Sequence, residues 1–146
     1  MTTEIHHAIE IDASPAAVWA VLADVAAYPE WNPFVLSLEG DVRQGARLTA
    51  RIAPPGGRAM TFRPTVLEAV PGQRLRWLGR FLLPGVFDGE HSFTIESLAG
   101  GRVRLTQEEQ FRGVLVPLLV RSLDRGTLPA FEKMNQALKR RAEQDG

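Results

Sequence analysis

The chain has 146 residues, enough for one domain with its own hydrophobic core, and its 45% hydrophobic and 23% charged content is ordinary for a globular protein. Lys plus Arg and Asp plus Glu both total 17, so no net charge attracts nucleic acid or an anionic membrane surface. Cysteine is absent, which excludes disulfides, thiolate nucleophiles and thiolate metal sites.

The N-terminal segment contains acidic residues and no apolar run, so we expect no signal peptide and a cytoplasmic location. The apolar stretch Val114–Val120 is too short to cross a bilayer and contains Pro117, so we expect no integral membrane segment. We expect residues 1–146 to form a single domain.

The first elements are a strand and two short helices. Residues 4–11 alternate apolar and polar side chains, which predicts a half-buried strand with Ile5 and His7 on one side. Ser14 followed by Pro15 is typical of a helix start, because Ser caps free backbone N–H groups and Pro suits the first turn. Residues 26–33 carry two prolines and predict a second short helix or a tight bend.

The middle of the chain has a period of two, which predicts an antiparallel meander. We expect a hairpin loop at residues 54–57 and an irregularity at Pro64, which cannot donate to a strand ladder. The six predicted strands span residues 34–39, 47–52, 59–70, 73–81, 86–98 and 102–111. The C-terminal segment changes to helical spacing, and Gly126 and Pro129 predict a kinked helix or two consecutive helices.

Three motifs carry a resemblance to a known family. Residues 9–19 (IEIDASPAAVW) resemble the opening strand and helix of the START-like superfamily, also called SRPBCC. Asp24 followed by residues 28–33 (YPEWNP) is similar to the second-helix signature of its bacterial members, and residues 131–139 (FEKMNQALK) to their last helix. The resemblance implies an α+β helix-grip fold, in which a bent antiparallel sheet wraps around a long C-terminal helix and leaves a cavity between them.

Polar residues stand on the predicted inner face of the last two strands. Val103 and Leu105 set the inward face of one strand, and continuing by twos adds Gln107 and Glu109. The same counting from Phe93 and Ile95 adds His91. An unpaired polar group in a solid core costs about 1–3 kcal/mol, so a solvated or ligand-filled cavity explains these residues. A position at a wet strand end explains them equally well.

The remaining candidates for a pocket lining are apolar, and ordinary core packing is an alternative explanation for each one. Ligand pockets are typically apolar with a few polar groups, which this inventory matches. The apolar candidates are Trp31, Phe34, Met60, Phe62, Trp77, Phe81, Phe93, Phe111, Leu119, Phe131 and Met134.

Three functions remain open from the sequence. The first is a carrier that binds a small hydrophobic or amphipathic molecule, such as a lipid, quinone or polyketide, with His91 and Glu109 as polar anchors. The second is an enzyme of the cyclase or dehydratase type, with His91 and Glu109 as acid and base. The third is a chaperone-activator-like interaction module that docks through the apolar loop at residues 82–87.

Other classes of site have no support in the sequence. His6 and His7 point to opposite faces of a strand, so with His91 they form no credible metal site. Phosphate-binding and dinucleotide-binding motifs are missing. The arginines at positions 74, 76 and 80 lack interleaved aromatic residues, which argues against nucleic-acid binding. We therefore expect no cofactor, no metal and no nucleic acid, in a monomer or a homodimer.

Overall fold

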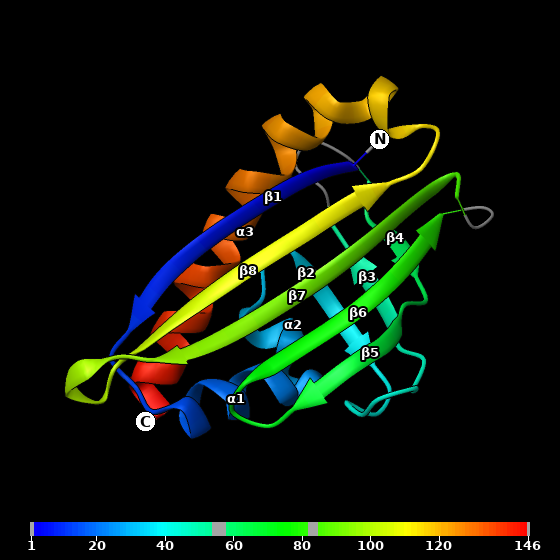
Figure 1. Cartoon of the computed structure of the whole chain (residues 1–146). Helices are drawn as coiled ribbons and strands as arrows, with labels where there is room; N and C mark the ends of the chain where they lie inside the picture. Colours follow the sequence, from blue (N-terminus) through cyan, green and yellow to red (C-terminus); the bar gives the residue numbers. More distant parts are fainter. Residues whose placement is uncertain (1, 54–57, 82–84, 146) are drawn as a thin grey trace.

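A computed structural model describes the chain apart from residues 1, 54–57, 82–84 and 146 (Figure 1). The predicted hairpin loop at 54–57 lies outside the described residues. The elements in chain order are β1 (Thr2–Ile11), α1 (Pro15–Ala23), the 3-10 turn η1 (Val25–Ala27), α2 (Tyr28–Trp31), β2 (Val35–Glu39), β3 (Thr49–Ile52), β4 (Met60–Phe62), β5 (Thr65–Val70), β6 (Arg74–Phe81), β7 (Phe87–Ser97), the 3-10 turn η2 (Ala99–Gly101), β8 (Val103–Arg112) and α3 (Val116–Asp145).

The segment after β1 folds as its capping residues predict. The Ser14 side chain accepts a hydrogen bond from the backbone N–H of Ala17 at 3.1 Å and caps α1. Residues 26–33 form the end of η1 and then α2, and the Tyr28 hydroxyl donates to the Leu22 carbonyl at 2.6 Å. Burial raises the pKa of Tyr28, so its hydroxyl remains a donor at neutral pH.

Asn32 turns the chain from α2 into β2. Its Oδ1 accepts hydrogen bonds from the backbone N–H groups of Phe34 at 3.0 Å and Val35 at 2.8 Å. Both groups would otherwise be unpaired where the chain leaves the helix. The side chain of Asn32 is buried, so this turn is part of the packed structure.

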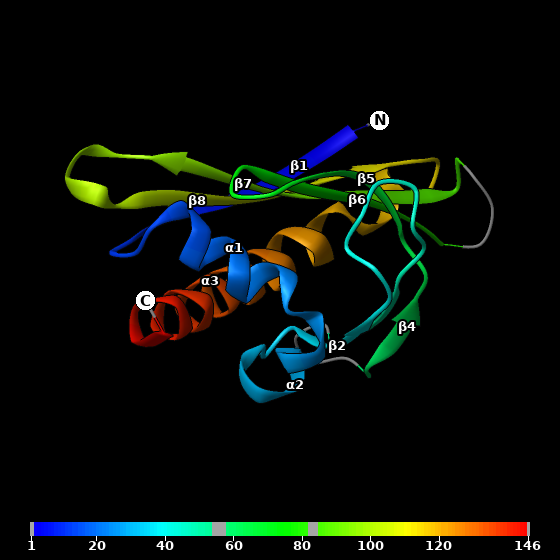
Figure 2. The ribbon, with the colours of Figure 1, turned by 90° about the horizontal axis from the view of Figure 1, so that it is seen from below.

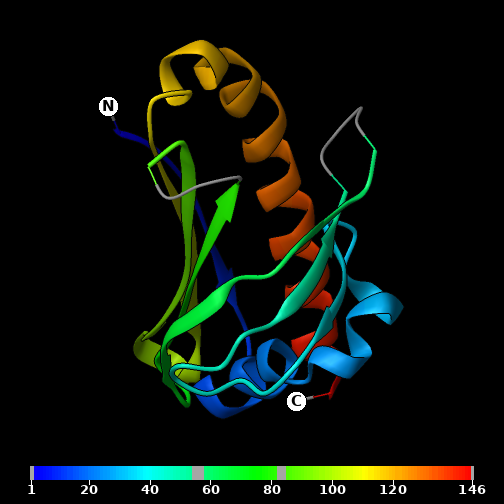
Figure 3. The same ribbon diagram turned by 90° about the vertical axis from the view of Figure 1, so that its right-hand side faces the viewer.

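The strands form two antiparallel sheets. Five strands pair in the order β1-β8-β7-β6-β5, and three pair in the order β2-β3-β4. Between the sheets run the bridge from Arg47 to Thr65 and a hydrogen bond from the Leu48 N–H to the Pro64 carbonyl at 2.8 Å. The three-stranded sheet curls away from the plane of the larger one, toward the side on which α3 lies (Figures 2 and 3).

The predicted strand at residues 59–70 is wrong as a single element. The chain forms β4 and β5 instead, and these belong to different sheets. Pro64 lies at the break, because it has no N–H to donate to a ladder. Its carbonyl still accepts from Leu48, so the corner between the sheets stays hydrogen-bonded.

The C-terminal segment is one helix that changes direction. α3 contains Pro129 in its interior, and its first turns run across the line of the longer remainder (Figure 1). This matches the kinked helix that Gly126 and Pro129 predict, rather than two separate helices. The remainder packs against the five-stranded sheet and α1, where Phe131, Met134 and Leu138 are fully buried.

The architecture is the α+β helix-grip fold that the sequence predicts: a curved antiparallel arrangement of strands around a long C-terminal helix (Figures 1 and 3). Among the described residues, no helix is long and apolar enough to cross a membrane. The face of the larger sheet that contacts α3 is called the inner face below.

Candidate functional site

The inner face of the larger sheet carries a row of residues that pair directly across four strands. Glu109 on β8 is the cross-strand partner of Ile5 on one side and His91 on the other, and His91 in turn pairs with Trp77. No register shift interrupts the pairing of β7 with β8, so alternation places these side chains as predicted. The polar residues of the sequence analysis therefore lie side by side.

His91 is enclosed by aromatic rings. Its imidazole stacks on Phe93 with centroids 4.7 Å apart, and lies 5.2 Å from the Trp77 ring and 5.1 Å from the Phe131 ring of α3. Only 3% of His91 is exposed. A histidine in such surroundings needs partners for both ring nitrogens, because each unpaired polar group in the core is costly.

Both nitrogens of His91 have partners. Nδ1 lies 3.0 Å from Oε1 of Glu109, and Nε2 lies 2.8 Å from Oε1 of Gln107. Gln107 donates from Nε2 to Oδ1 of Asn135 on α3 at 2.8 Å. Gln107 and Asn135 are completely buried. A chain of hydrogen bonds thus crosses the interface between the sheet and α3.

The far end of this chain fixes its direction. Nδ2 of Asn135 lies 2.9 Å from Nδ1 of His7 and 3.2 Å from the main-chain carbonyl oxygen of His7. A carbonyl oxygen only accepts, so the amide of Asn135 must direct its NH₂ group toward β1. Its Oδ1 then accepts from Gln107, the Gln107 oxygen faces His91, and Nε2 of His91 must carry a proton.

The other ring nitrogen of His91 faces a carboxylate. With Nε2 protonated, the second proton of the pair lies between Nδ1 of His91 and Oε1 of Glu109, 3.0 Å apart. The pair is either an imidazolium beside a carboxylate or a neutral imidazole beside a carboxylic acid. In either form it holds one transferable proton at the inner face.

Two glycines lie next to this pair on the inner face. Gly89 and Gly79 are cross-strand partners, and Gly89 also pairs with Phe111, so the row beside Glu109 has two positions without a side chain. A Cβ built on Gly89 would lie 3.1 Å from Oε2 of Glu109 and 3.7 Å from the Phe111 ring, so these side chains cover Gly89, whereas one on Gly79 would meet only the Gly89 carbonyl oxygen at 3.9 Å. The area above Gly79 and Gly89 is called the glycine patch below.

Glu109 is the end of the hydrogen-bonded chain beside the glycine patch; the other end, His7 on β1, is 23% exposed and lies 3.8 Å from Glu132. The Glu109 side chain is 16% exposed, against 4% for that of His91. Oε1 is bound to His91, whereas Oε2 lies over Gly89 and has no hydrogen bond to the residues that the structure describes. The glycine patch and this oxygen together form the candidate binding site.

The structure brings together many of the residues that the sequence analysis selects. Trp77, Phe93 and Phe111 are buried on the inner face with His91 and Gln107, beside the partly exposed Glu109, and Phe131 and Met134 face them from α3. Phe34 packs edge-on against Phe131 with centroids 6.0 Å apart. The role of all these residues in binding stays a prediction.

Besides Trp31, four of the selected residues lie away from the hydrogen-bonded chain or have side chains outside the described residues. Met60 is 43% exposed on β4, where Phe62 is half-buried. Phe81 ends β6 and Leu119 lies in α3, and their side chains are outside the described residues. Of the apolar loop, residues 82–84 also lie outside them, while the carbonyls of Gly85 and Val86 accept from the N–H groups of Val114 and Leu115 before α3.

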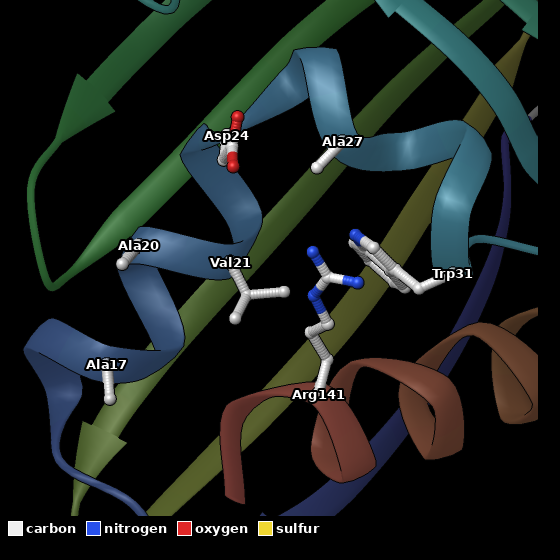
Figure 4. A pocket seen from close by; sticks show the side chains of 7 residues that line it. All are labelled: Ala17, Ala20, Val21, Asp24, Ala27, Trp31 and Arg141. Atoms are coloured by element: carbon white, nitrogen blue, oxygen red, sulfur yellow. The ribbon is translucent and has the colours of Figure 1, made fainter. Parts of the chain in front are cut away.

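Trp31 belongs to a different hollow, of about 180 Å³, between α1, α2 and α3 (Figure 4). Its lining residues are Ala17, Ala20, Val21, Asp24, Ala27, Trp31 and Arg141. The side chain of Arg141 extends from α3 alongside the Trp31 indole and forms an ion pair with Glu30 at 3.2 Å. Nε1 of Trp31 is buried without a hydrogen bond to the described residues. This hollow shares no lining residue with the glycine patch.

Sequence reasoning missed two members of the hydrogen-bonded chain. Asn135 lies four residues after Phe131 and three before Leu138, so helical spacing alone places it on the buried face of α3. The alternation of His7 with Ile5 and Ile9 predicts that its side chain points inward, but it gives no hydrogen-bond partner for it. Among the described residues, no cluster of histidine, aspartate and glutamate could hold a metal ion.

Comparison with known families identifies the chain. A family described as polyketide cyclase / dehydrase and lipid transport matches residues 2–143. The chain belongs to this family. This match confirms the START-like resemblance that the motifs in residues 9–19, 28–33 and 131–139 indicate. Comparison with curated protein sequences finds no match.

Solved structures share the fold of this family member at low sequence identity. A START superfamily protein from Mycobacterium smegmatis is 21% identical, with a TM-score of 0.75 over 98% of this chain and 99% of that one. The Zhui aromatase/cyclase from a Streptomyces species is 18% identical, with a TM-score of 0.73 over 100% and 99%. The di-domain aromatase/cyclase StfQ of the steffimycin biosynthetic pathway is 15% identical, with a TM-score of 0.80 over 99% of this chain. The chain spans 52% of the length of StfQ.

Proposed function

We propose that this protein binds a small hydrophobic or amphipathic molecule on the inner face of the larger sheet, over the glycine patch, with Glu109 as its polar anchor. The observation that carries the proposal is the combination of Gly79 and Gly89 with the hydrogen-bonded pair of His91 and Glu109. The missing side chain at Gly79 gives a molecule room, and the pair gives it one fixed polar contact. A cytoplasmic location is part of the proposal and rests on the sequence alone.

The aromatic surroundings support an apolar body for the ligand. Phe87 and Phe111 stack with centroids 5.5 Å apart beside Gly89, and Trp77 lies beside Gly79 on β6. Rings of this kind bind flat apolar molecules through large contact areas. Polyketides, quinones and lipids with a cyclic part belong to this chemical class.

Two valine substitutions in β6 test where the molecule binds. Gly79→Val adds a branched side chain on the inner face, whereas Arg80→Val adds the same side chain one residue later on the outer face. We expect native mass spectrometry, denaturing extraction and thermal shifts with a panel of hydrophobic ligands to detect binding to the native protein and to Arg80→Val. We expect Gly79→Val to bind at least about tenfold more weakly, at a loss of about 1.4 kcal/mol. Equal binding by both variants would refute the location.

The second candidate is an enzyme of the cyclase or dehydratase type. The contact of 3.0 Å between His91 and Glu109 favours it, because acid and base catalysis needs titratable groups positioned together. StfQ and Zhui are described as aromatase/cyclases, which supports the same reaction class. Incubation of a bound polyketide-like ligand, followed by mass analysis, distinguishes the candidates: loss of water or a new ring indicates turnover, and recovery of unchanged ligand indicates a carrier.

The third function, a chaperone-activator-like module, has less support. The described part of the apolar loop is bound to the residues before α3, through the carbonyls of Gly85 and Val86. Its docking role would need residues 82–84 as well, and these lie outside the described residues. We therefore do not propose it.

A further inference from the structure

We propose that the site selects aromatic or polycyclic ligands that donate a hydrogen bond, through a hydroxyl group, and discriminates against carboxylates and against analogues in which that hydroxyl is methylated. The inference rests on the proposed binding function and specifies its ligand class. Glu109 is the specificity-determining residue, and Asn135 and His7 are positioning residues that act through Gln107 and His91.

One oxygen of the hydrogen-bonded chain remains available to a ligand. His91 uses Nε2 for Gln107 and Nδ1 for Glu109, and Gln107 uses its oxygen for His91 and its nitrogen for Asn135. Asn135 uses Oδ1 for Gln107 and Nδ2 for His7. Among the described residues of this chain, Oε2 of Glu109 is the oxygen left without a partner at the inner face.

Oε2 of Glu109 acts as a hydrogen-bond acceptor. The His7 carbonyl directs the chain so that Nε2 of His91 is protonated, which leaves one proton for the contact between Nδ1 and Oε1 of Glu109. Whether that proton lies on nitrogen or on Oε1, Oε2 has no hydrogen and accepts. If the directions were reversed, Nε2 of His91 would accept from Gln107 and the ring proton would lie on Nδ1, which would donate to Oε1 and again leave Oε2 as an acceptor. The direction of the chain therefore decides the roles of Asn135 and His7.

An acceptor at this position selects a ligand that donates a hydrogen bond. A group that binds an acceptor must donate, which a hydroxyl does and a methyl ether does not. A ligand carboxylate has no hydrogen to donate to Oε2, which lies 3.1 Å from a Cβ built on Gly89, so the two groups would face each other as acceptors and repel. The neighbouring rings of Trp77, Phe111 and Phe87 favour an aromatic body for the molecule that carries the hydroxyl.

Two measurements test the inference. The first needs no ligand: ¹⁵N NMR of the histidine side chains in the native protein reports which nitrogens of His91 carry protons. We expect Nε2 to be protonated. An unprotonated Nε2 would show that the chain runs in the opposite direction and would overturn the positioning roles of Asn135 and His7.

The second measurement compares binding of 2-naphthol, 2-methoxynaphthalene and 2-naphthoate by thermal shift and titration calorimetry. We expect 2-naphthol to bind about 3 to 100 times more tightly than its methyl ether, the effect of one hydrogen bond to a neutral or a charged acceptor, and 2-naphthoate to bind most weakly. In Glu109→Met the ratio between the first two should fall to about 1, while Glu109→Gln, whose amide retains an oxygen acceptor, should keep part of the preference.

The outcomes separate the inference from the function on which it rests. Equal binding of 2-naphthol and its methyl ether to the native protein would overturn the donor preference and leave the binding function standing. An unchanged preference in Glu109→Met would assign the selectivity to another residue and also overturn the inference. Binding of none of the three probes, together with an empty protein in native mass spectrometry, would overturn both.

Discussion

The two faces of the larger sheet carry polar residues on the same strands, but these residues are buried on one face and partly exposed on the other. On the inner face, Gln107 and His91 are buried and joined in a directed chain of hydrogen bonds. On the outer face, Arg76 lies between Glu68 at 3.3 Å and Glu90 at 3.1 Å, and each of these side chains is at least 25% exposed. The outer groups can exchange a lost partner for water, whereas the inner groups cannot.

The difference indicates which polar residues relate to function. Ion pairs on an exposed face contribute little to stability and need no further explanation. A buried polar chain on an aromatic surface is retained at a cost, and its end at Glu109 lies beside the space that Gly79 leaves. The polar residues that relate to function are therefore those of the inner face.

The largest expected effect comes from Gln107→Leu. This change leaves Nε2 of His91 and Oδ1 of Asn135 without partners in a buried environment, so the free energy of unfolding should fall by about 2–4 kcal/mol. Urea unfolding monitored by tryptophan fluorescence measures it. The matched control is Glu108→Leu, one residue later on the outer face, which should change stability by less than about 0.5 kcal/mol. A similar loss in both variants would contradict the distinction between the faces.

A smaller effect is expected on the outer face from Arg76→Met. The change removes contacts with Glu68 and Glu90, and stability should fall by at most about 1 kcal/mol at low ionic strength. Because salt screens exposed charges, the difference from the native protein should nearly disappear at about 1 M NaCl. Arg51→Met, at an exposed position of β3 whose cross-strand partners Ser37 and Thr61 are uncharged, should show no such salt dependence. A loss that persists in salt would mean that Arg76 stabilises the sheet by packing.

The smallest effect concerns Glu143, which joins the end of α3 to the end of β1. The Lys139 ammonium and the backbone N–H of Asp12 hydrogen-bond to its Oε2 and lower the pKa of this carboxyl below its ordinary value of 4.5. A lowered pKa stabilises the native state above the ordinary value, and the contribution is lost as the pH falls through the native-state value.

Glu143→Gln should therefore lower the melting temperature by roughly 1–3 °C at pH 7, and the difference should vanish in acid. Thermal unfolding between pH 3 and pH 7 measures it, with the exposed Glu96→Gln as a control that changes nothing across this range. A difference that grows toward acid pH would refute the assignment.

The sequence predicted the faces of the strands well, because alternation is a local property. Counting by twos from Phe93 and from Leu105 places His91, Gln107 and Glu109 correctly on the inner face, since the pairing of β7 with β8 contains no bulge. The start of α1 at Pro15 and the change of direction in α3 also follow from local chemistry. The family resemblance, which three motifs carry, is confirmed.

The sequence did not predict features that depend on distant pairing. The irregularity at Pro64 was visible, but the division of residues 59–70 between two sheets depends on the bridge from Arg47 to Thr65. Asn135 has a polar side chain, and its burial is explained only by Gln107 on β8 and His7 on β1. The glycine patch requires the register of β6 against β7, which composition does not give.

The position of β1 has a consequence for how the molecule is made. β1 forms the edge of the larger sheet and pairs along its whole length with β8, from Thr2 opposite Arg112 to Ile11 opposite Val103. During synthesis the first strand therefore has no partner until most of the chain has left the ribosome, and contacts between such distant segments form slowly. The His7 carbonyl that orients Asn135 arrives with that strand. A truncated chain that lacks α3 would have neither the amide nor the histidine contact in place, so the direction of the hydrogen-bonded chain is set only after the two ends of the protein have met.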